Sequence, residues 1–185
     1  MLIDTNVAAL VRKAKLGDEE AFASLARRFL KATYAVALSI VGRQADAEDV
    51  SQDAFVTALS RIDTCRQEER FPGWLMQIVR NRAKNHLASR RLRDVPKKQV
   101  QDIREAGESP EKHVDTKKQL TSALMLLSPI QREIVLLHEL ENWSHSEIAE
   151  VTNITEGMSR QHLFTARRTL KERLVHFSTE EGQNV

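Results

Sequence analysis

Hydrophobic residues recur every three or four positions along most of the chain, and this period predicts helices. One amphipathic helix is expected over residues 6–16, before Gly17. A second begins after Asp18, which can cap it, and ends at Gly42. Further helices are expected from near Asp46, and after the loop that ends at Pro72. Few Gly and Pro with many Ala, Leu, Glu, Lys and Arg agree with an all-α chain.

The segment from Ser128 to Leu174 predicts three short helices in succession, the order of a helix-turn-helix. Ser128 precedes a proline that suits the first helical position. Ser144 and Glu147 stand three apart as a capping box for the second helix. Asn153, which tolerates the left-handed conformation, lies in the following turn, and Thr155 can cap the third helix.

The third helix combines an apolar stripe with a basic face. Its inward positions are Leu163, Ala166, Leu170 and Leu174. Its outward positions are Arg160, Gln161, Phe164, Arg167, Arg168 and Lys171. Residues 158–173 contain five Lys or Arg and one acid, a charge that suits DNA phosphates and purine edges in a major groove. The alternative is a helical hairpin whose basic face is merely solvated.

The N-terminal half carries acidic and basic segments in turn. Asp49, Gln52, Asp53 and Val56 form one stripe that suits docking on a basic partner helix, although acids at a helix start can simply be solvated. A polar loop over residues 63–70 precedes a helix that becomes basic, with eight Lys or Arg and one acid over residues 80–98. A basic helix beside such a loop favours nucleic acid over membrane. Trp74 fits a core position as well as a base-stacking one.

Composition narrows the remaining classes. Cys65 is the single cysteine, so no intrachain disulfide can form, and we expect a reducing cytoplasm with an incidental thiol. The first residues predict no signal peptide, and the longest apolar run, residues 34–41, is too short to cross a bilayer. No Gly-rich phosphate loop, metal-ligand cluster or nucleophile with a base is evident. We therefore expect no catalytic residues, metal or cofactor.

The pattern divides the chain into two small helical domains. We place the first at residues 1–93, a flexible polar linker at 94–114, the helix-turn-helix domain at 115–177 and a frayed tail at 178–185.

Four sequence blocks resemble the extracytoplasmic-function sigma factors, which keep only the second and fourth conserved regions of bacterial sigma factors. Residues 46–55 read DAEDVSQDAF, similar to D-A-E-D-L-V-Q-E-T-F, and residues 71–81 are similar to F-x-x-W-L-x-x-I-A-R-N. Residues 127–133 and 144–150 resemble L-P-x-x-Q-R-E and L-S-Y-x-E-I-A-E. Together the resemblance covers roughly residues 17–92 and 116–174.

The resemblance implies a promoter-specificity subunit that helps to melt the −10 region, and it implies roles for particular residues. Docking on the clamp helices of the largest polymerase subunit would use Asp49, Gln52, Asp53 and Val56. Contacts with the −10 element, including a base flipped into the loop from Thr64 to Phe71, would use Thr64, Arg66, Phe71, Trp74, Arg80, Asn81, Arg82, Lys84 and Asn85. Contacts with the −35 element would use Ser159, Arg160, Gln161, Phe164, Arg167, Arg168 and Lys171. The flap of the second subunit and an anti-sigma factor are further implied partners, and the linker would run toward the RNA exit path.

Departures from the family pattern and rival classes bear on this interpretation. Ser159 replaces a usual aliphatic residue, His162 stands where a basic residue is common, and Asn85 replaces an aspartate. Because the first two fall on the recognition helix, they predict an unusual upstream element. A response regulator would need an α/β receiver domain, which the pattern lacks. An enzyme lacks candidate chemistry, and a helical adaptor or antagonist mimic would not explain two basic surfaces.

Overall fold

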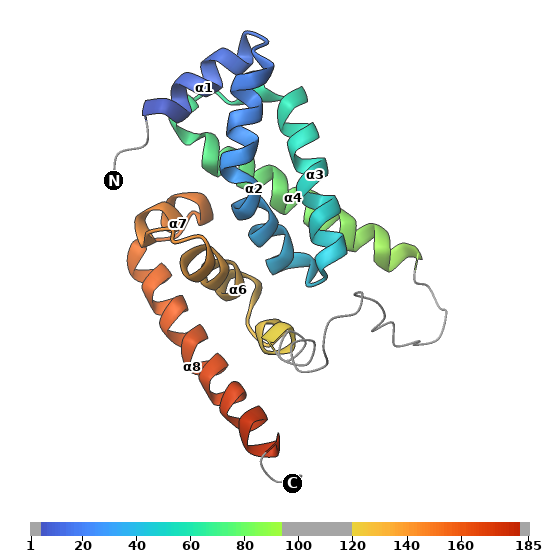
Figure 1. Cartoon of the computed structure of the whole chain (residues 1–185), viewed down its shortest axis with the longest axis vertical. Helices are drawn as coiled ribbons and strands as arrows, with labels where there is room; N and C mark the ends of the chain where they lie inside the picture. The colour runs from blue at the N-terminus through green and yellow to red at the C-terminus, as the bar shows by residue number, and fades with distance from the viewer. Residues whose placement is uncertain (1–4, 94–119, 182–185) are drawn as a thin grey trace.

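The computed structural model describes residues 5–93 and 120–181, and those residues form helices joined by turns, with no strand among them. The N-terminal group consists of α1 (Thr5–Lys15), α2 (Glu19–Val41), α3 (Gln44–Ser60) and α4 (Phe71–Arg93), with α2 in contact with each of the other three (Figure 1). Two 3-10 turns, η1 (Ile62–Thr64) and η2 (Glu68–Arg70), connect α3 to α4. The prediction of an all-α fold is confirmed.

Local sequence explains where the long helix α2 begins and ends. The Asp18 side chain accepts a hydrogen bond from the Ala21 amide at 2.9 Å and so caps the first turn. Gly42 ends α2 in the left-handed region, with φ of 73°. A Cβ at Gly42 would also lie 2.7 Å from the end of the Met125 side chain, so this glycine permits a close approach by the C-terminal half of the chain.

The C-terminal group contains the predicted helix-turn-helix. A helical segment at residues 120–125 leads to α6 (Pro129–Val135), the π-helical segment η3 (Leu136–Leu140), α7 (His145–Thr152) and α8 (Glu156–Glu181). Capping boxes form at Ser128 and at Ser144, and Asn153 closes α7 with φ of 57°. The predicted capping and turn residues are confirmed. However, α8 continues past residue 178, where the sequence predicted a tail.

The two helical groups pack directly against one another. Helix α6 and segment η3 lie on α2, and α7 lies on α4 (Figure 1). Buried side chains of both groups, including Leu25, Val36, Ile134 and Leu137, belong to one continuous hydrophobic cluster. The sequence predicted two domains but no interface between them. The predicted linker, residues 94–114, lies outside the described residues.

Buried polar groups fix this interface. Arg132 is 5% exposed, and its guanidinium donates to three backbone carbonyls: Leu124 at 2.9 Å, Leu127 at 3.0 Å and Ser39 of α2 at 2.6 Å. Burial lowers the pKa of Arg132. Since buried charge is tolerated only when it is hydrogen-bonded, these carbonyls position α6 against both the preceding segment and α2.

Candidate nucleic-acid interface

Helix α8 presents a polar and basic face beyond the compact helix-turn-helix. Leu163 and Ala166 are buried, Leu170 is half-buried, and Leu174 lies outside the residues whose side chains are described. The side chains that the sequence placed outward are exposed: Arg160, Gln161, Phe164, Arg167, Arg168 and Lys171. Phe164 is 64% exposed, so an apolar ring stands among charged groups. Such a ring suits contact with a thymine methyl.

Ser159 does not share this face, and the expectation that it contacts DNA is corrected. Its side chain is fully buried, and its hydroxyl lies 2.9 Å from Nδ1 of His145 at the start of α7. Ser159 precedes Leu163 by four positions and therefore continues the buried stripe of α8. That spacing could be read from the sequence, whereas the DNA contact of Ser159 was expected only because the family resemblance implied it.

A second histidine stacks beside this hydrogen bond. The rings of His138, in η3, and His145 lie 4.8 Å apart at 30°. Nδ1 of His138 is buried and, within the described residues, makes no hydrogen bond, although Glu139 Oε1 lies 3.5 Å away. Burial lowers the pKa of His145, as do the charges of His138, Arg160 and Arg167, while Glu156 opposes them. The lowered pKa favours the neutral form of His145.

The loop between α3 and α4 has exposed side chains along its length and is followed by a buried aromatic residue. Thr64 and Arg66 are exposed, as a base-contacting role requires. Phe71 is fully buried, with its ring 5.7 Å from those of Phe29 and Trp74. The prediction that Phe71 contacts DNA is therefore corrected for this conformation. The aromatic ring of Phe71 packs in the core instead and anchors the start of α4 there.

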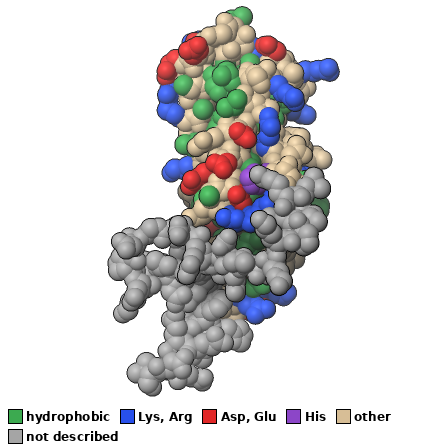
Figure 2. Space-filling model, turned by 90° about the vertical axis from the view of Figure 1, so that its right-hand side faces the viewer, with side chains coloured by type: hydrophobic (Ala, Val, Ile, Leu, Met, Phe, Trp, Pro, Cys, Tyr) green, Lys and Arg blue, Asp and Glu red, His purple; other side chains and the backbone are tan. Residues whose placement is uncertain are grey.

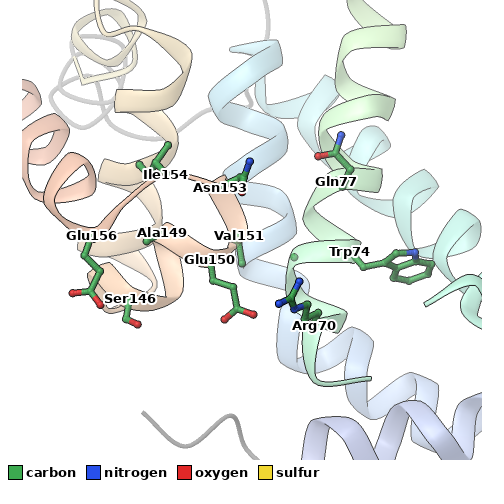
Figure 3. Close-up of a pocket in the computed structure, with 11 residues that line it drawn as sticks. Arg70, Trp74, Gln77, Ser146, Ala149, Glu150, Val151, Asn153, Ile154 and Glu156 are labelled. Carbon is green, nitrogen blue, oxygen red and sulfur yellow. The ribbon is translucent and has the colours of Figure 1, made fainter. Parts of the chain in front are cut away.

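Trp74 is half-buried at the edge of a hollow of about 750 Å³ between α4 and the helix-turn-helix. Figure 3 shows Arg70 and Glu150 extending toward each other from the two sides, while the Trp74 ring turns away from α7. The hollow is lined by polar groups from both halves of the chain, so the predicted −10 face and the turn of the helix-turn-helix lie side by side.

Arg80 faces the interface between the two groups and not solvent. Its guanidinium is 14% exposed and pairs with Glu133 of α6, itself 5% exposed, through two hydrogen bonds. The expected DNA contact of Arg80 is unavailable while the groups are packed. The partner lies 53 positions away, so no local pattern could have identified this pair.

The remaining predicted residues of α4 surround a basic hollow. Asn81, Arg82, Lys84 and Asn85 are exposed and line a space of about 430 Å³. Thr57 and Arg61 at the end of α3 complete it, and Arg82 Nε donates to Thr57 Oγ1 at 2.9 Å. Among the residues that the structure describes, no acid lines this hollow, which therefore suits a phosphate. Sequence analysis missed Arg61, because only the fold brings the end of α3 beside α4.

The acidic stripe on α3 is exposed as predicted. Asp49, Gln52 and Asp53 lie at the surface with Val56, which is 69% exposed. Leu59 is 52% exposed and extends the apolar part of this surface. Figure 2 looks onto the side where α3 and α4 lie and shows Lys and Arg side chains along one edge beside a patch of hydrophobic side chains. The acidic stripe of α3 and the basic hollow are thus two different surfaces.

The described residues offer little for other chemistry. Within them, no group of three His, Cys, Asp or Glu is placed to hold a metal ion. None of the described helices is long and apolar enough to cross a membrane. Cys65 is buried, and its burial raises the pKa of the thiol, which favours the protonated and unreactive form.

Comparisons with known proteins identify two family regions in the chain. Sigma-70 region 2 matches residues 25–93, and sigma-70 region 4 matches residues 117–170. The ECF RNA polymerase sigma factor BldN of Streptomyces coelicolor is 34% identical over 166 residues, which cover 87% of this chain but 63% of BldN. The chain thus spans less than two thirds of that relative.

Two solved structures share the fold. CnrH in complex with the cytosolic domain of CnrY aligns with a TM-score of 0.68 at 23% identity, covering 92% of this chain and 98% of CnrH. The sigma factor RpoE in complex with the anti-sigma factor NepR from Bartonella quintana aligns with a TM-score of 0.61 at 24% identity, covering 83% and 96%.

Proposed function

The chain belongs to the extracytoplasmic-function sigma factors of RNA polymerase, and on that premise we propose that it binds the core enzyme and directs transcription from promoters with −35 and −10 elements. Its role is recognition and not catalysis. The observation that carries the proposal is the capped helix-turn-helix whose last helix, α8, exposes Arg160, Gln161, Phe164, Arg167, Arg168 and Lys171 together.

At the −35 element, α8 enters the major groove by its N-terminal half. Arg160 pairs with Glu156 one turn earlier, but both side chains are about half exposed, so the pair holds little free energy. Arg160 can exchange Glu156 for a guanine edge at little cost. Two further cations, Arg167 and Lys171, lie further along α8 and contact the DNA phosphates. Arg167 is paired with Glu139, and both of these side chains are exposed.

At the −10 element, the loop and α4 contact different parts of the DNA. Thr64 and Arg66 on the loop meet the unpaired base, while Asn81, Lys84 and Asn85 meet the duplex and phosphates just upstream. The basic hollow adds Arg61 as a phosphate contact. Unstacking a base costs roughly a few kcal/mol, so these contacts must form together with strand opening.

The exposed stripe of Asp49, Gln52, Asp53 and Val56 docks on the clamp helices of the largest polymerase subunit, and the second subunit's flap receives the helix-turn-helix domain. An anti-sigma factor is a further proposed partner, since the similar sigma factor RpoE is solved in complex with one. The site of action is the cytoplasm, where RNA polymerase works.

Transcription in vitro tests this function. Purified chain and core polymerase are incubated with a random promoter library, and the transcripts that start are sequenced. Discrete start sites with paired upstream and downstream motifs are expected. Core polymerase alone is the control, and start sites identical with and without the chain would reject the proposal.

Substitution of Arg160 tests the −35 role separately. Arg160→Ala should weaken binding at particular upstream base pairs by about 1–3 kcal/mol, the value of a bidentate base contact. Arg173→Ala, an exposed change further along α8, is the matched control. Affinities for a set of upstream duplexes give the answer: an equal loss on every sequence would reduce Arg160 to a phosphate contact.

A further inference from the structure

The −10 reading loop, residues 61–70, contains two short 3-10 turns, η1 and η2. Each turn is closed by two backbone bonds: Thr64 N to Arg61 O at 2.8 Å and Cys65 N to Ile62 O at 3.0 Å in η1, and Arg70 N to Gln67 O at 3.0 Å and Phe71 N to Glu68 O in η2. The stretch between the turns is extended. Within the loop, Ile62 and Cys65 are buried and the other side chains are half-buried or exposed. Within the loop, the contact between the two turns is the weak bond from Cys65 Sγ to Gln67 O at 3.5 Å, so a stronger partner outside the loop can fix their relative placement.

Lys15, the last residue of α1, supplies that partner. Its Nζ donates to the Cys65 carbonyl at 2.7 Å and to Glu68 Oε1 at 2.6 Å. Cys65 directly follows η1 and Glu68 begins η2, so one ammonium joins both turns. The two side chains are 20% and 23% exposed. Both bonds are charge-assisted, the stronger class of hydrogen bond in proteins.

The ammonium is itself held on a rigid base. Val11 and Ala14 of α1 are buried, and the turn after α1 is closed by Asp18 N donating to Lys13 O at 3.1 Å. The bond from Lys15 lowers the pKa of the Glu68 carboxyl, which keeps it ionised for the pair. Helix α1 packs against both turns, and Lys15 is the side chain through which it donates hydrogen bonds to the loop.

We propose that Lys15 is a positioning residue for promoter recognition: by joining η1 to η2 it sets where Thr64 and Arg66 meet the unpaired −10 base. The inference rests on the proposed −10 role of the loop. It assigns a task in base discrimination to α1, a helix that lies before the part of the chain matched by sigma-70 region 2.

Three variants separate positioning from charge and from folding. Lys15→Met keeps the aliphatic stem and removes the donor, whereas Lys15→Arg restores a cationic donor. Lys13→Met, on the exposed side of the same helix, is the matched control for loss of one positive charge. Each variant is assembled with core polymerase, and the affinity is measured for single-stranded non-template oligonucleotides that differ only at the flipped base.

The expected result is a loss of discrimination. In Lys15→Met the ratio between the best and worst base should fall roughly 3–10-fold, the scale set by one net hydrogen bond. Lys15→Arg should recover part of the ratio, and Lys13→Met should keep it. Amide hydrogen exchange over residues 62–70 of the free chain should quicken in Lys15→Met and not in Lys13→Met.

Other outcomes are distinguishable. If the unmodified holoenzyme shows no preference at this base, the proposed −10 role of the loop fails. A preference that Lys15→Met retains in full would overturn the positioning inference alone. An equal loss of affinity for all four bases would also overturn it, because that result indicates a phosphate contact.

Discussion

Ser159 and His145 form the hydrogen bond that ties the start of α7 to the recognition helix. Ser159 is buried and directly precedes the exposed Arg160. Loss of the hydrogen bond would therefore weaken the packing behind the exposed face of α8, but the side chains on that face would stay the same. A hydroxyl at this buried position is tolerated because the imidazole nitrogen satisfies it. We therefore expect a change at Ser159 to alter the free energy of unfolding without altering the preference for DNA sequence.

Ser159→Ala should lower the free energy of unfolding by about 1 kcal/mol, because one hydrogen bond is lost and the His145 nitrogen loses its partner. The order of preference among upstream duplexes should stay unchanged. Thermal unfolding and duplex affinities measure the two effects, with Ser146→Ala, an exposed change on α7, as the control. An altered base preference would return Ser159 to the DNA interface.

His145 makes the helix-turn-helix sensitive to acid. In the unfolded chain the pKa of His145 has its ordinary value near 6.5, and in the fold it is lower. The contribution of neutral His145 to the free energy of unfolding is therefore fully present above the pKa of the unfolded chain. It decreases as the pH falls below that pKa, and it stops decreasing once the pH is below the pKa of the folded chain. His145→Gln should remove this part of the decline. Unfolding midpoints compared at several pH values check it, and parallel curves for both proteins would contradict it.

Helix α3 has an exposed acidic stripe that contributes little to the core, so its sequence is free to serve a partner. Asp53→Arg should therefore lower affinity for core polymerase and leave the unfolding midpoint nearly unchanged. A pull-down with core polymerase measures the first effect. Glu19→Arg, the same charge reversal at an exposed position on α2, is the control. Unchanged core binding by Asp53→Arg would show that the docking face lies elsewhere.

At the scale of elements, the sequence predicted what local chemistry decides. The caps at Asp18, Ser128 and Ser144 and the turn at Asn153 follow from side chains that satisfy nearby backbone groups, and each is found where expected. The start of α4 was harder. Phe71 comes after an irregular loop, and only the fold shows that its ring packs on Phe29 of α2.

Contacts between distant segments lay beyond sequence reasoning. Arg80 with Glu133, Lys15 with Cys65 and Glu68, and Arg61 beside α4 join residues whose separation no helical period relates. A basic residue on a helix has the same local signature whether it faces DNA, solvent or a buried acid. The sequence therefore predicted where the cations of α4 lie but not that Arg80 is enclosed.

For the whole molecule, the packed arrangement opposes the proposed function. The −10 and −35 elements lie apart along a promoter, whereas here α7 lies against α4 and Arg80 is held by Glu133. The two halves must separate when both elements are bound. Separation must break the enclosed ion pair, the bond from Arg132 to the Ser39 carbonyl and the hydrophobic cluster that the two groups share.

Arg80→Met should favour the separated form of the free chain. It leaves the Glu133 carboxylate buried without its partner, a loss worth about 3–5 kcal/mol when one member of such a pair is removed. Small-angle scattering should then show a larger radius of gyration. Lys84→Met, exposed on the same helix, should leave the radius unchanged. A compact Arg80→Met chain would show that apolar packing alone holds the interface.

The enclosed ion pair also bears on how this sequence can diverge. Replacing only Arg80 or only Glu133 would leave an uncompensated charge between α4 and α6. Replacing both with apolar side chains of similar volume would fill the same space without a buried charge. Among descendants that keep the packed form, positions 80 and 133 should therefore change in concert, by paired replacement or not at all. Descendants that have abandoned it should let the two positions drift independently.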